Sequence, residues 1–389
     1  MSENDNNNLL FRKVNGVIGV RGTTVADQIQ GELELLSLQK KVLHKIRGLV
    51  FALIAGLMQG VANVLFYMLV MIAIANTSDG PLYSEIPPKI WVVFSLMMAL
   101  ASEAGAALLL LINAALAKTF SEVKALFGNR KMCMRMLVIA TFAGPLAMSG
   151  LTLSQYLLQK NLHLSMSTFA GAAAYAGAVL WLRPRERFKL SILYALVLAM
   201  MGIFIISYDT HYGTIAATTS VIGVLLMLVY LLGFSMESVG TLMMMELFSP
   251  SVIACARYLF SIVGYLVIIV PMLGVAFYSY GQLGNLFLSL SEVLIQKTLG
   301  LMVLTAIASS MATLFWYEGI SRVGVGLSLP FYLSHPLWGL IISFPLLRSD
   351  LNHAYWKPLV VSAAFYAVSF LLVLAFAKDV SPYRQGEKC

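Results

Sequence analysis

Long runs with almost no charge dominate this sequence. About 20 apolar residues are enough for a helix to cross the hydrocarbon core of a bilayer. Ten runs of roughly this length occur, at 49–74, 90–117, 136–158, 164–182, 190–208, 215–245, 252–278, 299–317, 323–347 and 358–377. Backbone groups in lipid must be paired within their own segment, so each run predicts a helix. We therefore predict an all-α integral membrane protein with ten transmembrane helices.

Composition and charge exclude most soluble classes of protein. Only 11% of the residues are charged, whereas about 25% is usual for a soluble domain. The net charge of +8 does not predict a nucleic-acid partner, because the basic residues lie between the apolar runs. The three cysteines, Cys133, Cys255 and Cys389, have no metal-binding spacing, and we expect no metal or cofactor. The expected partners are the lipid bilayer and a small-molecule substrate, and the sequence does not indicate an oligomeric state.

The distribution of basic residues predicts the orientation. Loops rich in Lys and Arg stay on the cytoplasmic side of a membrane. With the N-terminus inside, 21 of the 26 Lys and Arg residues fall on the cytoplasmic side and 5 fall outside. We therefore predict cytoplasmic N- and C-termini in a multi-pass protein of a bacterial-type inner membrane.

The ten predicted helices divide into two halves of five. The halves, 49–208 and 215–377, are 160 and 163 residues long. An odd number of helices in each half makes the second half enter the membrane from the opposite side, which is the inverted repeat of many secondary transporters. Residues 1–48 are predicted as a cytoplasmic N-terminal extension and 378–389 as a cytoplasmic tail.

Several short motifs lie within or next to these predicted helices. They are 142–150 (FAGPLAMSG), 182–186 (LRPRE), 201–208 (MGIFIISY), 233–239 (GFSMESV), 256–258 (ARY) and 316–326 (WYEGISRVGVG). In this order they resemble the drug/metabolite transporter superfamily, specifically its ten-helix EamA-type members. The resemblance covers 49–377 and implies a secondary transporter, although the solutes of this superfamily differ too much for it to identify a substrate. The chain departs from the pattern at Gln59–Gly60, where a Trp-Gly pair is common, and the second predicted helix lacks an arginine matching Arg257.

Few ionisable residues lie within the predicted spans, and such residues are functional candidates by default. Glu103 lies thirteen residues after Ile90, about 20 Å along the helix. It is a candidate for coupling or substrate binding, or a carboxyl bonded to a neighbouring helix. Glu237 and Arg257 lie about 12 Å and 8 Å from the cytoplasmic helix ends, at depths that allow them to pair. Such a pair would form part of a gate or would only hold two helices together. Glu318 lies at a predicted cytoplasmic helix end, where we expect it to be solvated or paired with a basic residue.

Two further polar faces are candidates for the substrate path. Tyr332, His335 and Trp338 lie broadly on one face of the predicted helix 323–347. Pro336 lies among them and frees a carbonyl near Tyr332. This face lines a solute path or only bridges helices.

The second face is on the first predicted helix, where Gln59 and Asn63 lie one turn apart. The same two alternatives apply to it, a solute path or a bridge between helices. Trp338 is the one tryptophan predicted in mid-span, whereas the other four, including Trp316, are predicted at the two membrane–water interfaces.

The sequence predicts a secondary transporter that moves a small organic metabolite by alternating access, with Glu103 as the candidate proton-coupling group. The chain has no Walker A motif, so we do not expect it to be driven by ATP. The alternative within transport is efflux of organic cations or drugs. An integral-membrane enzyme acting on a lipid-linked substrate would need clustered acids or histidines in its loops, which are short here, and we do not expect an enzyme. A receptor or scaffold acting through 1–48 is a further alternative.

Overall fold

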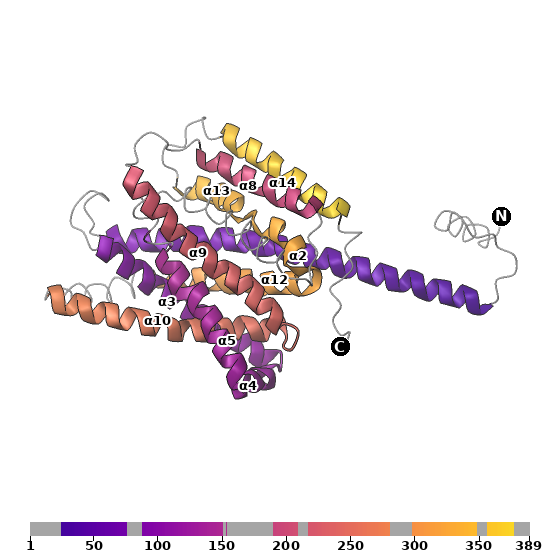
Figure 1. Ribbon diagram of the computed structural model, residues 1–389, viewed down its shortest axis with the longest axis horizontal. Helices are drawn as coiled ribbons and strands as arrows, with labels where there is room; N and C mark the ends of the chain where they lie inside the picture. The colour runs from indigo at the N-terminus through magenta and orange to yellow at the C-terminus, as the bar shows by residue number, and fades with distance from the viewer. Residues whose placement is uncertain are drawn as a thin grey trace. The chain divides into compact units, whose positions relative to one another are not determined.

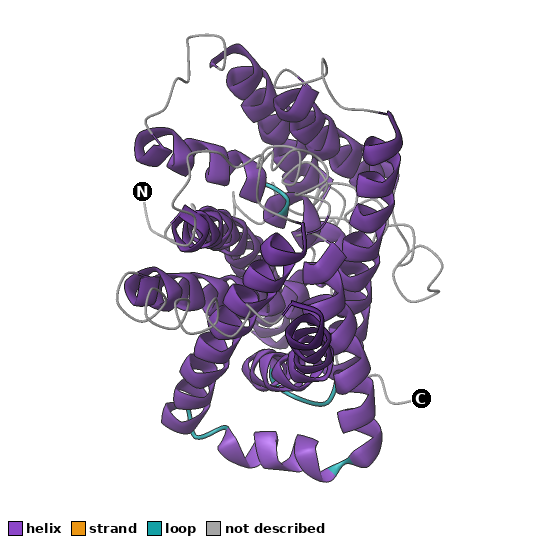
Figure 2. Ribbon diagram, turned by 90° about the vertical axis from the view of Figure 1, so that its left-hand side faces the viewer, coloured by secondary structure: helices purple, strands orange, loops and turns teal. Residues whose placement is uncertain are grey.

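The computed structural model describes residues 25–75, 88–150, 153, 190–208, 217–280, 298–347 and 356–376. The chain divides into two compact units, 1–44 and 45–389. The helices of the second unit are α2 (Val25–Ala75, which begins in the first unit), α3 (Pro88–Leu116), α4 (Phe120–Gly128), α5 (Arg130–Thr141), the π-helix η2 (Phe142–Leu146), α8 (Leu190–Tyr208), α9 (Ala217–Met244), α10 (Pro250–Tyr280), α12 (Leu299–Tyr332), α13 (His335–Leu347) and α14 (Trp356–Phe376). Every regular element in the described ranges is a helix, as Figure 2 shows.

Several of these helices are long and apolar enough to cross a membrane. The described residues contain five such segments, Val42–Phe66, Ser95–Leu116, Arg130–Gly150, Pro250–Ile268 and Leu299–Tyr332. The prediction of an all-α protein embedded in a membrane is thus confirmed for the described residues. The count of ten spans and the inverted repeat stay predictions. The predicted span 164–182 and the motif at 182–186 lie outside the described residues.

The predicted and observed helix boundaries differ where charge or backbone conformation intervenes. α8 has the predicted bounds, Leu190–Tyr208. α2 begins at Val25 rather than at the predicted 49, because charged residues end a membrane-crossing run without ending a helix. α12 joins the predicted spans 299–317 and 323–347 across Gly324, whose backbone has φ 79° and ψ 167°. A positive φ costs glycine little, so the chain bends there.

Helices from the two predicted halves pack against each other. α3 packs against α10 and α12, and α5 packs against α9 and α10 (Figure 1). α8 and α14, which are far apart in sequence, also lie side by side (Figure 1). The polar residues of α3 thus face those of α10 and α12 inside the bundle.

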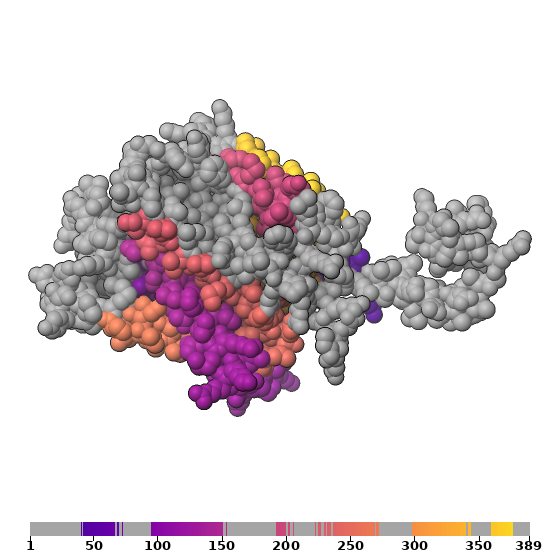
Figure 3. All heavy atoms as spheres, viewed as in Figure 1, coloured from indigo at the N-terminus to yellow at the C-terminus, as the bar shows by residue number. Residues whose placement is uncertain are grey.

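Large apolar side chains cover the outside of the bundle, and its interior combines small residues with large ones. Val267 of α10 is 67% exposed and Leu371 of α14 is 65% exposed, while Ala106, Ala254 and Tyr265 are buried. The surfaces of α8 and α14 adjoin on the face that Figure 3 shows. An apolar outer surface fits a bundle that meets lipid, and the small buried residues let helices pack closely.

α2 approaches the junction of α12 and α13 at two glycines. A Cβ on Gly56 would lie 2.8 Å from the carbonyl oxygen of Phe331 and 2.9 Å from that of Tyr332. A Cβ on Gly60 would lie 2.8 Å from the carbonyl oxygen of His335. Such distances are too short for any side chain, so the close approach requires glycine. It brings the neighbouring Gln59 to the end of α12.

Candidate functional site

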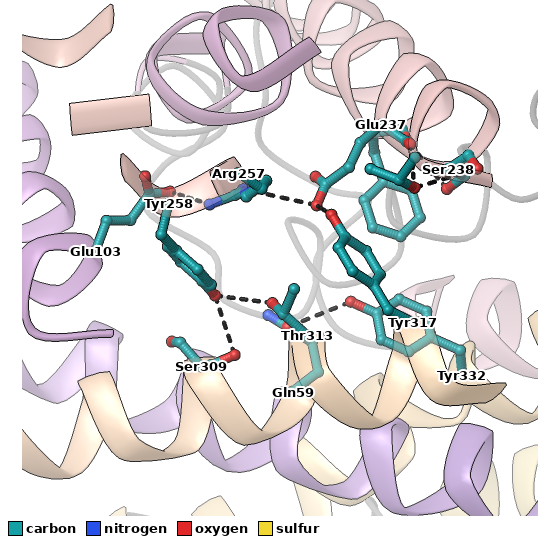
Figure 4. Close-up of polar contacts among 12 residues, drawn as sticks. Gln59, Glu103, Glu237, Ser238, Arg257, Tyr258, Ser309, Thr313, Tyr317 and Tyr332 are labelled. Atoms are coloured by element: carbon teal, nitrogen blue, oxygen red, sulfur yellow. Dashed lines mark hydrogen bonds and ion pairs between the residues drawn. The ribbon is translucent and has the colours of Figure 1, made fainter. Parts of the chain in front are cut away.

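The centre of the site is a buried ion network around Arg257 of α10. Its Nη1 lies 2.9 Å from Oε1 of Glu103 on α3, and its Nε lies 3.2 Å from Oε1 of Glu237 on α9. Figure 4 draws both contacts. The guanidinium also lies over the ring of Tyr258, with 4.5 Å between Cζ and the ring centroid. One cation therefore joins two acids from two other helices.

The burial and charge of this network distinguish it from an ordinary ion pair. Glu103, Glu237 and Arg257 are all buried within the bundle. Two carboxylates share one guanidinium, so the fully ionised network carries one excess negative charge. A buried charge needs a partner and complete hydrogen bonding to be tolerated, because removing it from water is costly. The network is therefore poised to change its charge or its contacts.

Two tyrosines connect the network to α12. The hydroxyl of Tyr317 donates to Oε1 of Glu237 over 2.7 Å, so this oxygen is shared with Arg257. The hydroxyl of Tyr258 lies 3.0 Å from the carbonyl oxygen of Ser309 and 2.8 Å from Oγ1 of Thr313. Figure 4 shows these contacts beside Arg257. Helices α3, α9, α10 and α12 thus contribute polar groups to a single region.

An aromatic cluster formed by Phe234, Trp316 and Tyr332 is the second part of the site. The rings of Trp316 and Tyr332 stack with centroids 4.2 Å apart, and Phe234 stacks on Tyr332 at 5.6 Å. The Tyr332 hydroxyl donates to Oε1 of Gln59 over 3.2 Å. Nε2 of Gln59 donates in turn to Oδ1 of Asn63 over 2.8 Å. The cluster thus combines flat apolar surface with a short chain of amides from α2.

Two hydrogen-bond donors in this cluster are unused by the described residues. Nδ2 of Asn63 and Nε1 of Trp316 are both buried and have no hydrogen-bond partner among them. Buried donors are nearly always paired in folded proteins. A ligand with hydrogen-bond acceptors would satisfy both groups.

The helix is interrupted just before Pro336. α12 ends at Tyr332, and α13 begins at His335 after a two-residue turn. Pro336 is the second residue of α13, where its missing N–H costs no helical bond. Nδ1 of His335 lies 3.1 Å from the carbonyl oxygen of Tyr332. Nε1 of Trp338 donates to Oγ of Ser334 over 3.0 Å.

The structure brings together some of the predicted site residues. The predicted pairing of Glu237 and Arg257 is observed, and Glu103 joins the same network. Gln59 and Asn63 are hydrogen-bonded to each other, and Gln59 accepts from Tyr332. His335 is buried with its ring centroid 5.4 Å from that of Tyr332. Trp338 is part-buried and bonds within the α12–α13 turn.

Two predictions about these positions need correction. Trp316 was predicted at the membrane–water interface, but its exposed fraction is 2% and it stacks inside the bundle. Its position near the end of the run 299–317 suggested an interface, whereas the continuation of α12 buries it. A single continuous helix face for Tyr332, His335 and Trp338 was also wrong, because the chain turns between Tyr332 and His335.

Sequence reasoning did not identify Tyr317 or Phe234 as part of the site. Both lie next to residues that it did single out, within the motifs at 316–326 and 233–239. Every predicted span contains at least one tyrosine or phenylalanine, so composition alone could not select these two. Among the described residues, no three His, Cys, Asp or Glu side chains gather to hold a metal ion.

Polar contacts away from the central network are simpler. Oε2 of Glu122 on α4 accepts from the backbone N and from Oγ of Ser249, over 3.3 Å and 2.9 Å. Oε2 of Glu318 lies 2.9 Å from Nη2 of Arg322, one turn later on α12. Glu318 thus pairs with a basic residue, one of the two predicted alternatives, but it lies within α12 rather than at a helix end.

Comparisons with known proteins give information about the fold only. No family model matches the chain, and no curated protein matches it. A solved structure described only as the crystal structure of a protein matches with a TM-score of 0.52 and 15% identity. The match covers 83% of this chain and 97% of that one. At this identity the two chains share a fold, and the similarity carries no information about substrate.

Proposed function

We propose that the protein is a secondary transporter that moves a small organic metabolite across the inner membrane by alternating access between two five-helix halves. The observation that carries the proposal is the buried network of Glu103, Arg257 and Glu237. Glu103 belongs to the first predicted half, and Arg257 and Glu237 belong to the second. A group that joins the halves at their centre can change partners when the halves move.

The energetics of the network favour a functional role over a purely structural one. Apolar side chains of similar volume would pack the same helices without the cost of burying charge. Ionisable residues within membrane-spanning helices usually mark substrate or ion pathways. A carboxylate that gains or loses a proton as the halves move would couple transport to a gradient, and Glu103 has only Oε1 bonded to Arg257.

The aromatic cluster supports a substrate with a flat apolar part and hydrogen-bond acceptors. Small-molecule sites are largely apolar, with a few polar groups that orient the ligand. Trp316 and Tyr332 offer the apolar surface, and the unused donors of Asn63 and Trp316 offer the polar contacts. Trp316 of the cluster is followed by Tyr317, whose hydroxyl donates to Glu237, so the cluster adjoins the ion network.

A second candidate is the export of organic cations, and the excess negative charge of the network favours it. A cationic ligand would find two carboxylates for one guanidinium, and rings such as Trp316 bind cations through their faces. The two candidates differ in the ligand they require. A metabolite would be bound through its acceptors, whereas a quaternary ammonium ion has none to offer to Asn63.

Transport by the purified full chain in proteoliposomes tests the proposal. A metabolite mixture and a set of quaternary ammonium ions are placed on one side, and solutes that cross are identified by mass spectrometry. Glu103→Gln should fold normally and lose net transport driven by an ion gradient, with the proton tested first. Glu246→Gln, at an exposed helix end, is the matched control and should transport as the wild type does.

Two results would contradict this proposal. The first is a wild-type protein that moves no solute from either set. The second is full gradient-driven transport by Glu103→Gln, which would return Glu103 to a packing role.

A further inference from the structure

Three buried side-chain oxygens, one of Glu103 and two of residues on α10, take no part in the contacts of the ion network. Glu103 binds Arg257 through Oε1, and its Oε2 has no hydrogen bond of regular geometry among the described residues. The same holds for Oγ of Ser261 and the hydroxyl of Tyr265. Ser261 and Tyr265 are both 0% exposed, and Glu103 is 8% exposed. Because a buried polar atom without a partner is costly, three in one region indicate a ligand.

These oxygens lie along one seam between α3 and α10. Arg257, Ser261 and Tyr265 follow each other at intervals of four residues, so they share one face of α10. Since Arg257 contacts Glu103, this face is turned toward α3. Helix side chains lean toward the N-terminus, which directs the Tyr265 ring back toward Ser261. Oγ of Ser261 lies beside the Glu103 carboxyl and interacts with it, although without a hydrogen bond of regular geometry.

Gly144 shows that two of the oxygens border the same small space. A Cβ on Gly144 would lie 3.4 Å from Oε2 of Glu103 and 3.1 Å from Cβ of Ser261, and it would overlap Oγ of Ser261. Gly144 belongs to η2, a π-helical segment that contains Pro145. Such segments are rare and occur frequently at functional sites. The irregular helix thus brings bare backbone against Glu103 and Ser261.

Charge and donor type specify the class of ligand. With both acids ionised, the network has one negative charge more than Arg257 compensates, and a monovalent cation restores neutrality. A carboxylate and two hydroxyls are hard oxygen ligands, which suit alkali cations and protons rather than soft metals. The unused groups of the aromatic cluster, by contrast, are N–H donors, which repel a cation.

We propose that Oε2 of Glu103, Oγ of Ser261 and the hydroxyl of Tyr265 bind a small monovalent cation, Na⁺ or a proton. Na⁺ would be ligated by all three oxygens, whereas a proton would reside on Oε2, whose O–H would donate a hydrogen bond to one of the hydroxyl oxygens. The role of this cation as the coupling ion rests on the proposed transport function. Binding of the cation to the purified protein is independent of the proposed transport function.

Thermal unfolding of the purified full chain in detergent tests the binding of Na⁺ and of protons separately. Na⁺ is titrated against choline at constant ionic strength in alkaline buffer, and pH is then lowered in choline alone. A ligand that binds the folded state raises the unfolding midpoint. A rise with Na⁺ identifies sodium, and a rise with falling pH alone identifies the proton.

The pH arm must separate Glu103 from its ionisable neighbours. The ionisable groups around it are Arg257, Tyr258 and Tyr265 of α10 and Glu237 of α9, and Tyr317 of α12 contacts Glu237. Arg257 keeps its charge throughout the accessible pH range. Glu237 is the other carboxyl, but Ser261→Ala changes a side chain beside Glu103 and leaves the contacts of Glu237 intact. A pH response that this variant shifts to higher pH therefore belongs to Glu103.

Each test variant has a matched control, which is the same type of substitution at another residue within a helix. Ser261→Ala and Tyr265→Phe should weaken the apparent affinity for Na⁺ about 10-fold or more, because each removes one of few ligands. For the proton, Ser261→Ala removes a donor beside the ionised carboxylate, so the pH response should move to higher pH. Ser102→Ala and Tyr366→Phe change buried residues that have backbone partners, and they should respond as the wild type does. Gly144→Ala should abolish the response, while Gly300→Ala, with open space around its Cβ position, should preserve it.

The inference is overturned if neither cation raises the midpoint of the wild type. It is also overturned if Ser261→Ala, Tyr265→Phe and Gly144→Ala all respond as the wild type does. Should one of these variants fail to fold, the others and their controls still decide. A cation response that depends on these residues, in a protein that transports no solute, would contradict the proposed function and leave the cation site standing.

Discussion

Two arginines of this protein lie in settings that differ mainly in charge balance. Arg257 and Arg322 each contact glutamate, and each lies over an aromatic ring, Tyr258 at 4.5 Å and Phe51 at 4.7 Å. Arg322 has one acid, Glu318, on its own helix, and the two side chains are 24% and 29% exposed. Arg257 has two acids on two other helices and is buried.

This contrast indicates where function resides in a helical membrane protein. A one-to-one pair within a single helix does not depend on how helices are arranged, so it contributes little to any change of state. A buried cation shared by two acids depends on three helices and has an excess charge. Movement of any of those helices alters its energy, and a ligand or proton that changes its charge alters the helix arrangement in return.

Replacing each arginine in turn should give the largest difference in stability between the two settings. Arg257→Met leaves two buried carboxylates without a cation and should destabilise the protein by about 3–5 kcal/mol. Arg322→Met removes a partly exposed pair and should cost about 0–1 kcal/mol. Unfolding in detergent, followed by circular dichroism or intrinsic fluorescence, measures both. Equal losses for the two variants would remove the distinction between the sites.

Exchanging the charges of each pair tests whether a third group is coupled to it. Glu318→Arg with Arg322→Glu should recover nearly wild-type stability, because that pair has no third member. Glu237→Arg with Arg257→Glu should not recover, because Glu103 would then face a carboxylate. The two double-mutant cycles should differ in interaction energy by about 1–3 kcal/mol. Full rescue of the central exchange would show that Glu103 is not coupled to the pair.

Loss of a hydrogen bond should cost more stability in the ion network, where the acceptor is a carboxylate, than in the aromatic cluster, where it is a neutral amide. Tyr317→Phe removes a donor to the Glu237 carboxylate and should cost about 1.5–3 kcal/mol. Tyr332→Phe removes a donor to the neutral Gln59 amide, keeps the stacked ring, and should cost about 0.5–1.5 kcal/mol. Both are measured by chemical unfolding. The reverse order would contradict the assignment of the stronger hydrogen bond to the ion network.

A variant with almost no effect on stability tests the orientation of the chain. Gly128 is exposed at the end of α4, with nothing within 4 Å of its Cβ position, so Gly128→Cys should leave stability unchanged. In a chain without its native cysteines, a membrane-impermeant thiol reagent added outside intact cells should not label it. The same reagent should label it after the cells are opened. Labelling from outside would invert the predicted topology.

The membrane helices could be predicted from the sequence because the information is local. The length of an apolar run and the absence of charge determine whether a segment can cross a bilayer, and α8 has its predicted bounds. The depths of Glu237 and Arg257 also follow from residue counting, which is why their pairing could be anticipated. The positive φ at Gly324 and the turn before Pro336 were not predicted, although both occur at residue types that permit a break in a helix.

Which side chains meet across helices depends instead on the tertiary structure. Glu103 could be identified as an unusual carboxyl, but its contact with Arg257 depends on the rotation of α3 against α10. The burial of Trp316 and the bond from Tyr317 to Glu237 depend on α9 and α12 packing together. A residue's depth is determined by counting along its own helix, whereas its direction is determined by every helix around it. The candidate cation site beside Gly144 is of the second kind, because its oxygens come from α3 and α10 and its wall from η2.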